Sequence, residues 1–310
     1  MGFERDLRII INNALRQKDG KMVPVTFHHS WKLYSEKQRL TAMREFAVNG
    51  AKHLVLGDTF LKMMGEDYTL LGVLKDQLAQ AGLDFVDAHA PFRDFGDLFI
   101  PDERDRRQMI ARQKLNLLLV SELGVDPCTF HVGSKYYPDH TVDEHREALY
   151  RSLDELLPVA EKYGITLCLE NLVRPLSTAD DLISYMKKYD SPNLGVCLDV
   201  GHANLKEKGR NEPASEIPPL WKAIGREVYW EENIAEKLQP YIVNCHVHDN
   251  RNAVDDHDLP GTGTVDWKRI VPVLLHSPRL KNIQSEVLTS RRSIPIRVVC
   301  ETVNGLFGVR

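Results

Sequence analysis

Short apolar runs recur along this chain and alternate with longer segments whose apolar residues return every three or four positions. The short runs are apolar at consecutive positions, which is typical of strands buried on both faces of a parallel sheet. We therefore predict strands at Val23–His29, His53–Leu56, Phe85–His89, Cys128–His131, Thr166–Glu170, Gly195–Asp199, Ile242–His246 and Asn282–Glu286.

The segments between these runs have the helical period. The clearest predicted helices are Gln38–Asn49, Leu70–Ala81, Arg104–Leu123, Val142–Tyr163 and Ala179–Tyr189. A glycine follows several of them, as at Gly82 and Gly164, where the left-handed conformation commonly closes a helix. Strand alternating with helix eight times predicts a (β/α)8 TIM barrel, with an open doubly wound sheet as the alternative.

Two segments interrupt the alternation. Asn204–Trp230 is charged and rich in proline, so we expect an inserted loop that covers the site, contacts substrate or lies idle on the surface. Asp249–Gly263 is a second long loop. The spacing of Ile294–Phe307 predicts the eighth helix, which makes Glu301 a helical residue. Because no linker-like shift in composition divides the chain, we predict one domain over residues 1–310.

The composition indicates the class of partner and the cellular compartment more than it indicates the function. The chain has 310 residues, of which 43% are hydrophobic and 27% are charged, with a formal charge of −4 and a pI near 6.3. This balance gives no general attraction to nucleic acid or anionic membranes, although a local basic rim is compatible with it. The five cysteines form no Cys-x-x-Cys pair and are interpreted as small buried hydrophobes. Without a leader or an apolar run of ~18 residues, we expect a cytoplasmic protein with no membrane span.

Histidines and carboxylates follow most of the predicted strands. The nine candidates are His89, His131, Glu170, Asp199, His202, His246, Asp255, His257 and Glu286. Because the catalytic side chains of TIM barrels come from the carboxyl ends of several strands, we expect these residues to converge. His28 and His29, which end the first predicted strand, are expected to pack rather than to bind. The array predicts a metal-dependent enzyme.

The central group is Glu170, Asp199, His246 and Glu286. Three carboxylates and one imidazole suit Mn²⁺, Mg²⁺, Co²⁺ or Zn²⁺, and also Fe²⁺. Since three carboxylates over-compensate one divalent cation, one glutamate could act as a base while the metal stays bound.

The remaining candidates have competing interpretations. His89, His131, His202, Asp255 and His257 could build further metal positions around the first. His89 and His131 could instead hydrogen-bond substrate hydroxyls, and Asp255 and His257 could be solvated members of a charged loop. His202 could equally contact substrate or support a neighbouring carboxylate.

His246 and His248 are alternative candidates for the same metal-ligand position. They lie two residues apart, so both point to the same side of a strand.

Taken in order, the motifs resemble those of the xylose-isomerase-like TIM barrel superfamily. They are VDAHAPF, TFHVGS, LCLENL, CLDVGHANL, CHVHDN, the Asp-x-His of 255–257, LPGTGTVDW and QSEV. That superfamily contains sugar and sugar-phosphate isomerases and epimerases, inosose dehydratase-like enzymes and the endonuclease IV class of apurinic endonucleases. The resemblance runs from about Val23 to the end of the chain. The ordered series is specific for the superfamily, though not for one activity.

The resemblance also implies a ligand set. In the isomerases and epimerases, one divalent metal is typically held by Glu, Asp, His and Glu, which correspond here to Glu170, Asp199, His246 and Glu286. The superfamily's H-x-K-D or H-x-N-D element corresponds to 246–249, which favours His246 as the ligand. The departure is His248, where Lys or Asn is usual. In the endonucleases nine ligands hold three zinc ions, and matching residue types occur here at every corresponding motif.

We therefore expect a divalent-metal-dependent isomerase or epimerase of a small sugar or sugar derivative. Proton transfer would pass through a metal-stabilised enediolate, with Glu170 and Glu286 as base and acid. His202, His89 and His248 would contact the substrate. The expected partner is a small-molecule sugar, and pairing of barrel rims into a homo-oligomer is compatible with the sequence.

Two other functions are considered. A trinuclear zinc phosphodiester hydrolase that cuts DNA at abasic sites would need all nine ligands, a basic track and an apolar wedge, for which Phe92 or Phe95 is available. The inserted loop forms no clean basic strip, so nucleic acid is the less favoured partner. A silent sugar-binding barrel is least favoured, because clustered carboxylates destabilise a fold unless a metal or a function compensates them.

Overall fold

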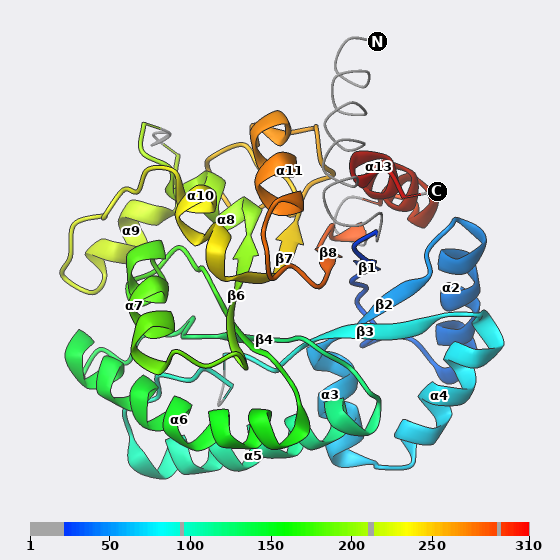
Figure 1. Ribbon diagram of the computed structural model, residues 1–310, viewed down its shortest axis with the longest axis horizontal. Helices are drawn as coiled ribbons and strands as arrows, with labels where there is room; N and C mark the ends of the chain where they lie inside the picture. The colour runs from blue at the N-terminus through cyan, green and yellow to red at the C-terminus, as the bar shows by residue number, and fades with distance from the viewer. Residues whose placement is uncertain (1–21, 94–95, 210–213, 290–292, 310) are drawn as a thin grey trace.

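The computed structural model describes residues 22–93, 96–209, 214–289 and 293–309. Its strands form one closed barrel in chain order, and every neighbouring pair is parallel. The strands are β1 (Val25–Phe27), β2 (His53–Leu56), β3 (Asp84–His89), β4 (Cys128–His131), β5 (Leu167–Glu170), β6 (Leu194–Asp199), β7 (Ile242–Val247) and β8 (Ile283–Ser285). Helices surround the barrel (Figure 1). The predicted (β/α)8 barrel is confirmed, and the open sheet is excluded.

The helices of the described residues include all of those predicted, with ends shifted by two residues or fewer. They are α2 (Glu36–Val48), α3 (Asp58–Glu66), α4 (Leu70–Ala81), α5 (Glu103–Glu122), α6 (Val142–Tyr163), α7 (Ala179–Tyr189), α8 (Val200–Lys206), α9 (Ile217–Lys222), α10 (Ile234–Leu238), α11 (Trp267–Leu275) and α13 (Ile296–Phe307). A short 3-10 turn, η1 (Gln239–Tyr241), precedes β7. No helix among the described residues is long and apolar enough to cross a membrane.

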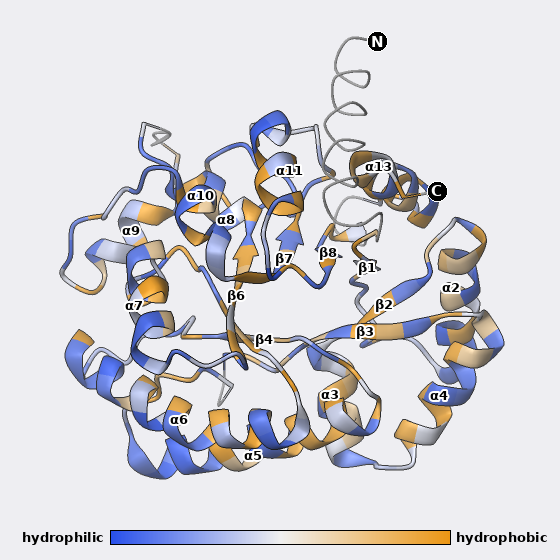
Figure 2. Ribbon diagram, in the orientation of Figure 1, coloured by the Kyte–Doolittle hydropathy of each residue, from blue (hydrophilic) through white to orange (hydrophobic). Residues whose placement is uncertain are grey.

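Local signals explain where these helices begin and end. α2 starts earlier than predicted because the Ser35 hydroxyl accepts a hydrogen bond from the Gln38 N–H and caps the first turn. Thr141 caps α6 in the same way, and Gly164 closes it in the left-handed conformation. The buried residues of α6 recur at spacings of three and four, as the amphipathic pattern predicts. Figure 2 shows both apolar and polar faces on this helix.

The strand register brings the candidate ligands together. His131 on β4 pairs with Glu170 on β5, and Asp199 on β6 pairs with His246 on β7. Because all strands are parallel, their carboxyl ends meet at one end of the barrel. The last candidate, Glu286, directly follows β8.

The inserted segment is more ordered than predicted. The prediction of a loop from 204 to 230 is wrong at two places, because α8 extends to Lys206 and α9 occupies Ile217–Lys222. Ile217 and Trp221 bury against Leu205 and Val173 in a small separate core, which stabilises these short helices. Residues 210–213 of the segment lie outside the described residues.

The ammonium group of Lys206 also holds the inserted segment. It lies over the rings of Trp221 and Trp230, at 4.5 Å and 5.8 Å from their centroids, and donates to the Tyr229 carbonyl.

The tail forms α13, and Glu301 lies on it as an exposed residue paired with Arg297. Its predicted place on a helix, away from the strand ends, is confirmed.

Candidate metal centre and active site

A cavity of about 510 Å³ opens at the carboxyl ends of the strands. It lies within the volume range of small-molecule sites. Several predicted site residues line it: His89, His131, Glu170, His202, Asp255, His257 and Glu286. Asp199, His246 and His248 are fully buried behind this lining.

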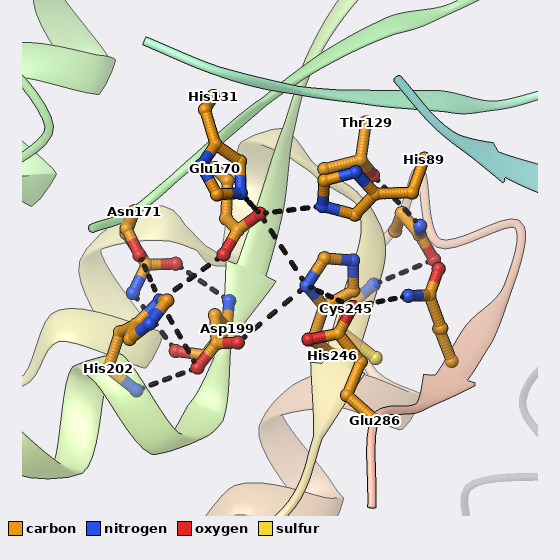
Figure 3. A network of polar contacts seen from close by, with 12 residues as sticks. His89, Thr129, His131, Glu170, Asn171, Asp199, His202, Cys245, His246 and Glu286 are labelled. Carbon is orange, nitrogen blue, oxygen red and sulfur yellow. Dashed lines mark hydrogen bonds and ion pairs between the residues drawn. The ribbon is translucent and has the colours of Figure 1, made fainter. Parts of the chain in front are cut away.

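Glu170, Asp199 and Glu286 all approach one ring nitrogen of His246 (Figure 3). The Nδ1 atom of His246 lies 3.6 Å from Glu170 Oε2, 3.6 Å from Asp199 Oδ2 and 3.4 Å from Glu286 Oε1. Ligand atoms that each lie ~2.1 Å from one ion are separated by roughly 3.0–3.5 Å. Each carboxylate thus lies close to the ligand-to-ligand spacing from His246 Nδ1. Groups of three ligand atoms that lie within 4.8 Å of one another combine His246 and Glu286 with His89, and Glu170 and Asp199 with His202.

Unpartnered polar atoms at this point support the same interpretation. His246 is fully buried, yet neither of its ring nitrogens has a hydrogen-bond partner among the described residues, and Glu170 Oε2 has none there either. Buried polar groups in proteins are almost always satisfied. A cation bound by nitrogen and carboxylate oxygen would satisfy His246 Nδ1 and Glu170 Oε2 together.

Neighbouring polar groups orient the carboxylates. The His202 N–H donates to Asp199 Oδ1 at 2.6 Å, and the Gln284 amide donates to Glu286 Oε1 at 2.6 Å. The Asn171 side chain bonds both the N–H and the carbonyl of Asp199, which fixes the end of β6 against β5. Outer contacts of this kind hold metal ligands in place.

A second group of ligand atoms lies on the β3–β4 side. His89 Nε2 is 3.4 Å and His131 Nε2 is 3.1 Å from the same oxygen, Glu170 Oε2. These three residues offer one atom each within 4.8 Å of one another. Phe92 stacks on the His131 ring at 4.2 Å, while Phe95 lies outside the described residues.

A third group surrounds Asp255. Its Oδ2 lies 3.3 Å from His202 Nε2 and 3.0 Å from His257 Nε2. His202 also reaches Glu170 Oε1 at 3.2 Å through Nδ1, so it connects this group to the central one.

The predicted substrate contact of His248 does not agree with its position. Its ring is fully buried, with Nε2 at 3.1 Å from Asp199 Oδ2, and it stacks on His257 at 4.0 Å. β7 ends at Val247, and His248, the next residue, is not among the residues that line the cavity. His202 and His89, in contrast, both line the cavity.

Charge pairing dominates the electrostatics of the site. Burial alone would raise the pKa of Glu170, but the charges of His131 and His246, together with the close approach of the His131 and His202 rings, hold this pKa well below its usual value. Burial would likewise lower the pKa of His246, yet Cys197, Glu286 and Glu170 raise it well above the usual value. Because metal ligands bind in deprotonated form, a divalent cation would replace the neutralising protons.

Several cavity residues were not recognised in the sequence. His28, expected to pack, lines the cavity beside Asp58, while His29 does pack, against Trp31, Tyr34 and Phe46. Gln284, whose amide donates to Glu286, was also missed. Its position two residues before Glu286 could have indicated this contact, because alternate strand residues share a face.

Arg93 and Arg174 complete the wall, with Glu216 and Leu220 from the inserted segment. No spacing rule connects these residues to the ligand series, so only the tertiary structure reveals them.

Comparison with protein families matches residues 50–283 to the xylose isomerase-like TIM barrel. This chain belongs to that family. The recognition from the motifs is confirmed.

Two curated relatives are uncharacterized proteins. One, from Methanocaldococcus jannaschii, is 28% identical over 196 residues, which make up 60% of this chain and 58% of the relative. The other, from Sinorhizobium fredii, is 24% identical over 176 residues, or 54% and 49% of the two chains. The chain thus spans about half the length of the curated relatives it matches.

Solved structures with the same fold cover nearly all of the chain. L-ribulose 3-epimerase superposes with a TM-score of 0.70 at 15% identity, covering 93% of this chain and 94% of that one. For 3-keto-D-glucoside 4-epimerase YcjR from E. coli the TM-score is 0.67 at 17% identity, with 92% and 99% covered. A Mycobacterium smegmatis barrel in complex with magnesium gives 0.67 at 16% identity, with 93% and 97% covered.

Proposed function

We propose that this protein is a divalent-metal-dependent isomerase or epimerase of a small sugar or sugar derivative. The observation that carries the proposal is the approach of Glu170, Asp199 and Glu286 to the buried His246 imidazole, which has no hydrogen-bond partner in the part of the chain that the structure describes. The sugar epimerases among the similar structures support it, as does the magnesium bound to one relative of the fold.

Two glutamates supply the proton chemistry. Glu170 and Glu286 both line the cavity and approach His246 from different strands, β5 and the end of β8. One removes a proton from the carbon next to the substrate carbonyl, and the other returns a proton at the neighbouring carbon or on the opposite face. A divalent cation, when bound by the four side chains, lowers the free energy of the negative charge that develops on the substrate oxygens.

Other residues hold the substrate and limit water. His202 and His89 line the cavity, so they are placed to contact the substrate. Leu172 and Leu220 form an apolar part of the wall. Leu220 belongs to α9, so the inserted segment encloses the substrate, and water exclusion there strengthens the electrostatic contacts.

Solvent exchange tests the acid–base assignment directly. Metal-loaded protein is incubated with a panel of ketoses and aldoses in D₂O, and deuterium at carbon is measured by NMR. We expect incorporation by the wild type, and loss by E170Q and by E286Q. E301Q is the matched control because Glu301 is exposed on α13. Full exchange in both E170Q and E286Q would refute the proposal.

A three-metal phosphodiester hydrolase is a second candidate, and the two flanking groups favour it. His89 and His131 share Glu170 Oε2, while His202 and His257 share Asp255 Oδ2. Elemental analysis separates the candidates, because an isomerase needs about one metal per chain and the hydrolase about three. Cleavage of an abasic duplex that stops on addition of a chelator would establish the hydrolase.

A further inference from the structure

Two arginines line the cavity together with the acidic and histidine groups. They are Arg93, which follows β3, and Arg174, which follows β5. Among the described residues, Arg174 has no hydrogen bond or ion pair through its guanidinium group, and the Arg93 guanidinium only faces the Phe92 ring at 5.8 Å. Two permanent cations therefore face a site whose other charges are carboxylates and histidines.

The two carboxylates whose charges act on Arg174 are engaged in other hydrogen bonds. Asp97 accepts hydrogen bonds from the N–H groups of Arg93, Ser134 and Lys135 and from the Ser134 hydroxyl. Glu216 accepts from the Asp255 N–H at 3.1 Å. Burial lowers the pKa of Arg174 and so does the charge of Arg93, although Asp97 and Glu216 oppose them. The Arg174 guanidinium is thus partly desolvated and has no partner of its own within the described ranges of the chain.

The backbone around both arginines is held in place. The Trp221 indole donates to the Val173 carbonyl at 2.8 Å, so α9 fixes the residue next to Arg174. Arg93 has a positive φ of 54°, in the left-handed region that is strained for a non-glycine residue. Its N–H is bonded by Asp97 at 2.9 Å. Strain retained at a cavity wall is typical of residues that position a ligand.

We propose that the substrate carries an anionic group, a phosphate or a carboxylate, which Arg174 binds with the assistance of Arg93. The neutral part of the substrate then extends toward Glu170 and Glu286. This assignment rests on the isomerase or epimerase function proposed above and narrows its substrate class to sugar phosphates or sugar acids. Arginine suits the role because its planar guanidinium binds both kinds of oxyanion through paired N–H donors.

Equilibrium binding tests this subsite separately from turnover. Isothermal titration of metal-loaded protein compares matched probes: D-fructose with D-fructose 6-phosphate, D-ribulose with D-ribulose 5-phosphate, and D-glucose with D-glucuronate. Inorganic phosphate is titrated into chelator-treated protein as a probe that needs no sugar. The variants are R174Q and R93Q, with R107Q as the control, because Arg107 is exposed on α5.

We expect the phosphorylated or acidic probe to bind about 10- to 100-fold more tightly than its neutral counterpart. R174Q should abolish that preference and the binding of inorganic phosphate, R93Q should reduce both, and R107Q should leave both unchanged. A preference for phosphates identifies sugar phosphates, and a preference for the uronate identifies sugar acids.

The proposal is overturned if inorganic phosphate does not bind, if R174Q retains the preference, or if R174Q weakens charged and neutral probes equally. Binding of an abasic duplex that depends on Arg174, without binding of the small probes, would also overturn it. Because these outcomes concern binding, they remain distinct from a failure of deuterium exchange, which would overturn the proposed reaction.

Discussion

Two buried aspartates inside the barrel have opposite electrostatic settings. Asp199, at the end of β6, has two imidazoles within 3.5 Å, His248 at 3.1 Å and His202 at 3.5 Å. Asp87, two residues before His89 on β3, has the neutral amide of Asn244 at 3.4 Å. Both side chains are fully buried.

Their pKa values move in opposite directions. Burial raises the pKa of Asp87 to about 7, and the hydrogen bonds of Thr26 and Asn244 only partly offset it. Burial acts on Asp199 as well, but the charges of His202 and His248 outweigh it and lower the pKa of Asp199 well below its usual value. Depth in the barrel therefore does not decide whether a carboxylate is charged; the neighbouring side chains do.

The difference separates two layers of the barrel. We call the layer of Asp199, His246 and Glu286 the reactive end, and the layer of Asp87 and Asn244 the structural interior. Asn244 bonds Thr129 at 3.1 Å and its own oxygen accepts from Asn282 at 3.1 Å, so this interior network is built from neutral groups. The layer above it, at the carboxyl ends of the strands, contains the carboxylates and histidines of the site. Their charges balance one another only while the histidines stay protonated or a cation is bound.

The largest effect should come from the reactive end. E170Q and E286Q should each reduce turnover by roughly 10²–10⁴-fold, because each removes a general acid or base. D87N should retain most of the activity, since Asp87 lies one layer below. Rate constants from deuterium exchange measure this, and a loss in D87N equal to that in E286Q would show that the two layers act as one.

Stability against pH should distinguish the two aspartates. The pKa of Asp87 is about 7 in the folded protein and is raised from 3.8, so this group makes wild-type stability fall as the pH rises from about 4 to 7. D87N removes this pH dependence. Relative to the wild type, its free energy of unfolding should therefore increase by up to about 4 kcal/mol as the pH rises over that range.

D199N should behave in the opposite way. Because the pKa of Asp199 is lowered, its contribution is present above the unfolded value and lost as the pH falls. D199N should therefore be less stable than the wild type at pH 8, by an amount that shrinks in acid. Urea unfolding with chelator present at several pH values checks both variants, and parallel profiles for D87N and wild type would contradict the contrast.

Metal should stabilise only the reactive end. At a free Mn²⁺ concentration 100 times its dissociation constant, binding adds about 2.7 kcal/mol to the free energy of unfolding. H246Q should lose this gain, while E301Q should keep it. Thermal unfolding with and without Mn²⁺ measures the difference, and an unchanged gain in H246Q would place the metal elsewhere.

The smallest effect concerns His248. H248N should weaken metal binding by about tenfold, because His248 orients Asp199 without facing the cavity. Metal titration measures the affinity. A loss as large as that in H246Q would make His248 a ligand and reverse the choice between the two histidines.

Much of the fold and part of the site could be predicted because they depend on local patterns. Consecutive apolar positions predicted the strands, and a parallel barrel brings residues that end its strands to one edge. The positions of Glu170 and Asp199 follow from that rule alone. The inserted segment was harder, since α9 is too short to form without Trp221 packing on Val173.

The amino-acid order by itself determined which elements form and which side chains end them. The signals for this are the helical period, the runs of consecutive apolar residues and the helix caps, and each acts over a few residues. Only the tertiary structure decided that His248 lies behind Asp199 and that Arg174 and Arg93 line the same cavity. Those arrangements join residues about 50 to 80 positions apart, and nothing local encodes them. They arise because closing the barrel brings distant loops to one rim, where burial and neighbouring charge determine what each side chain can do.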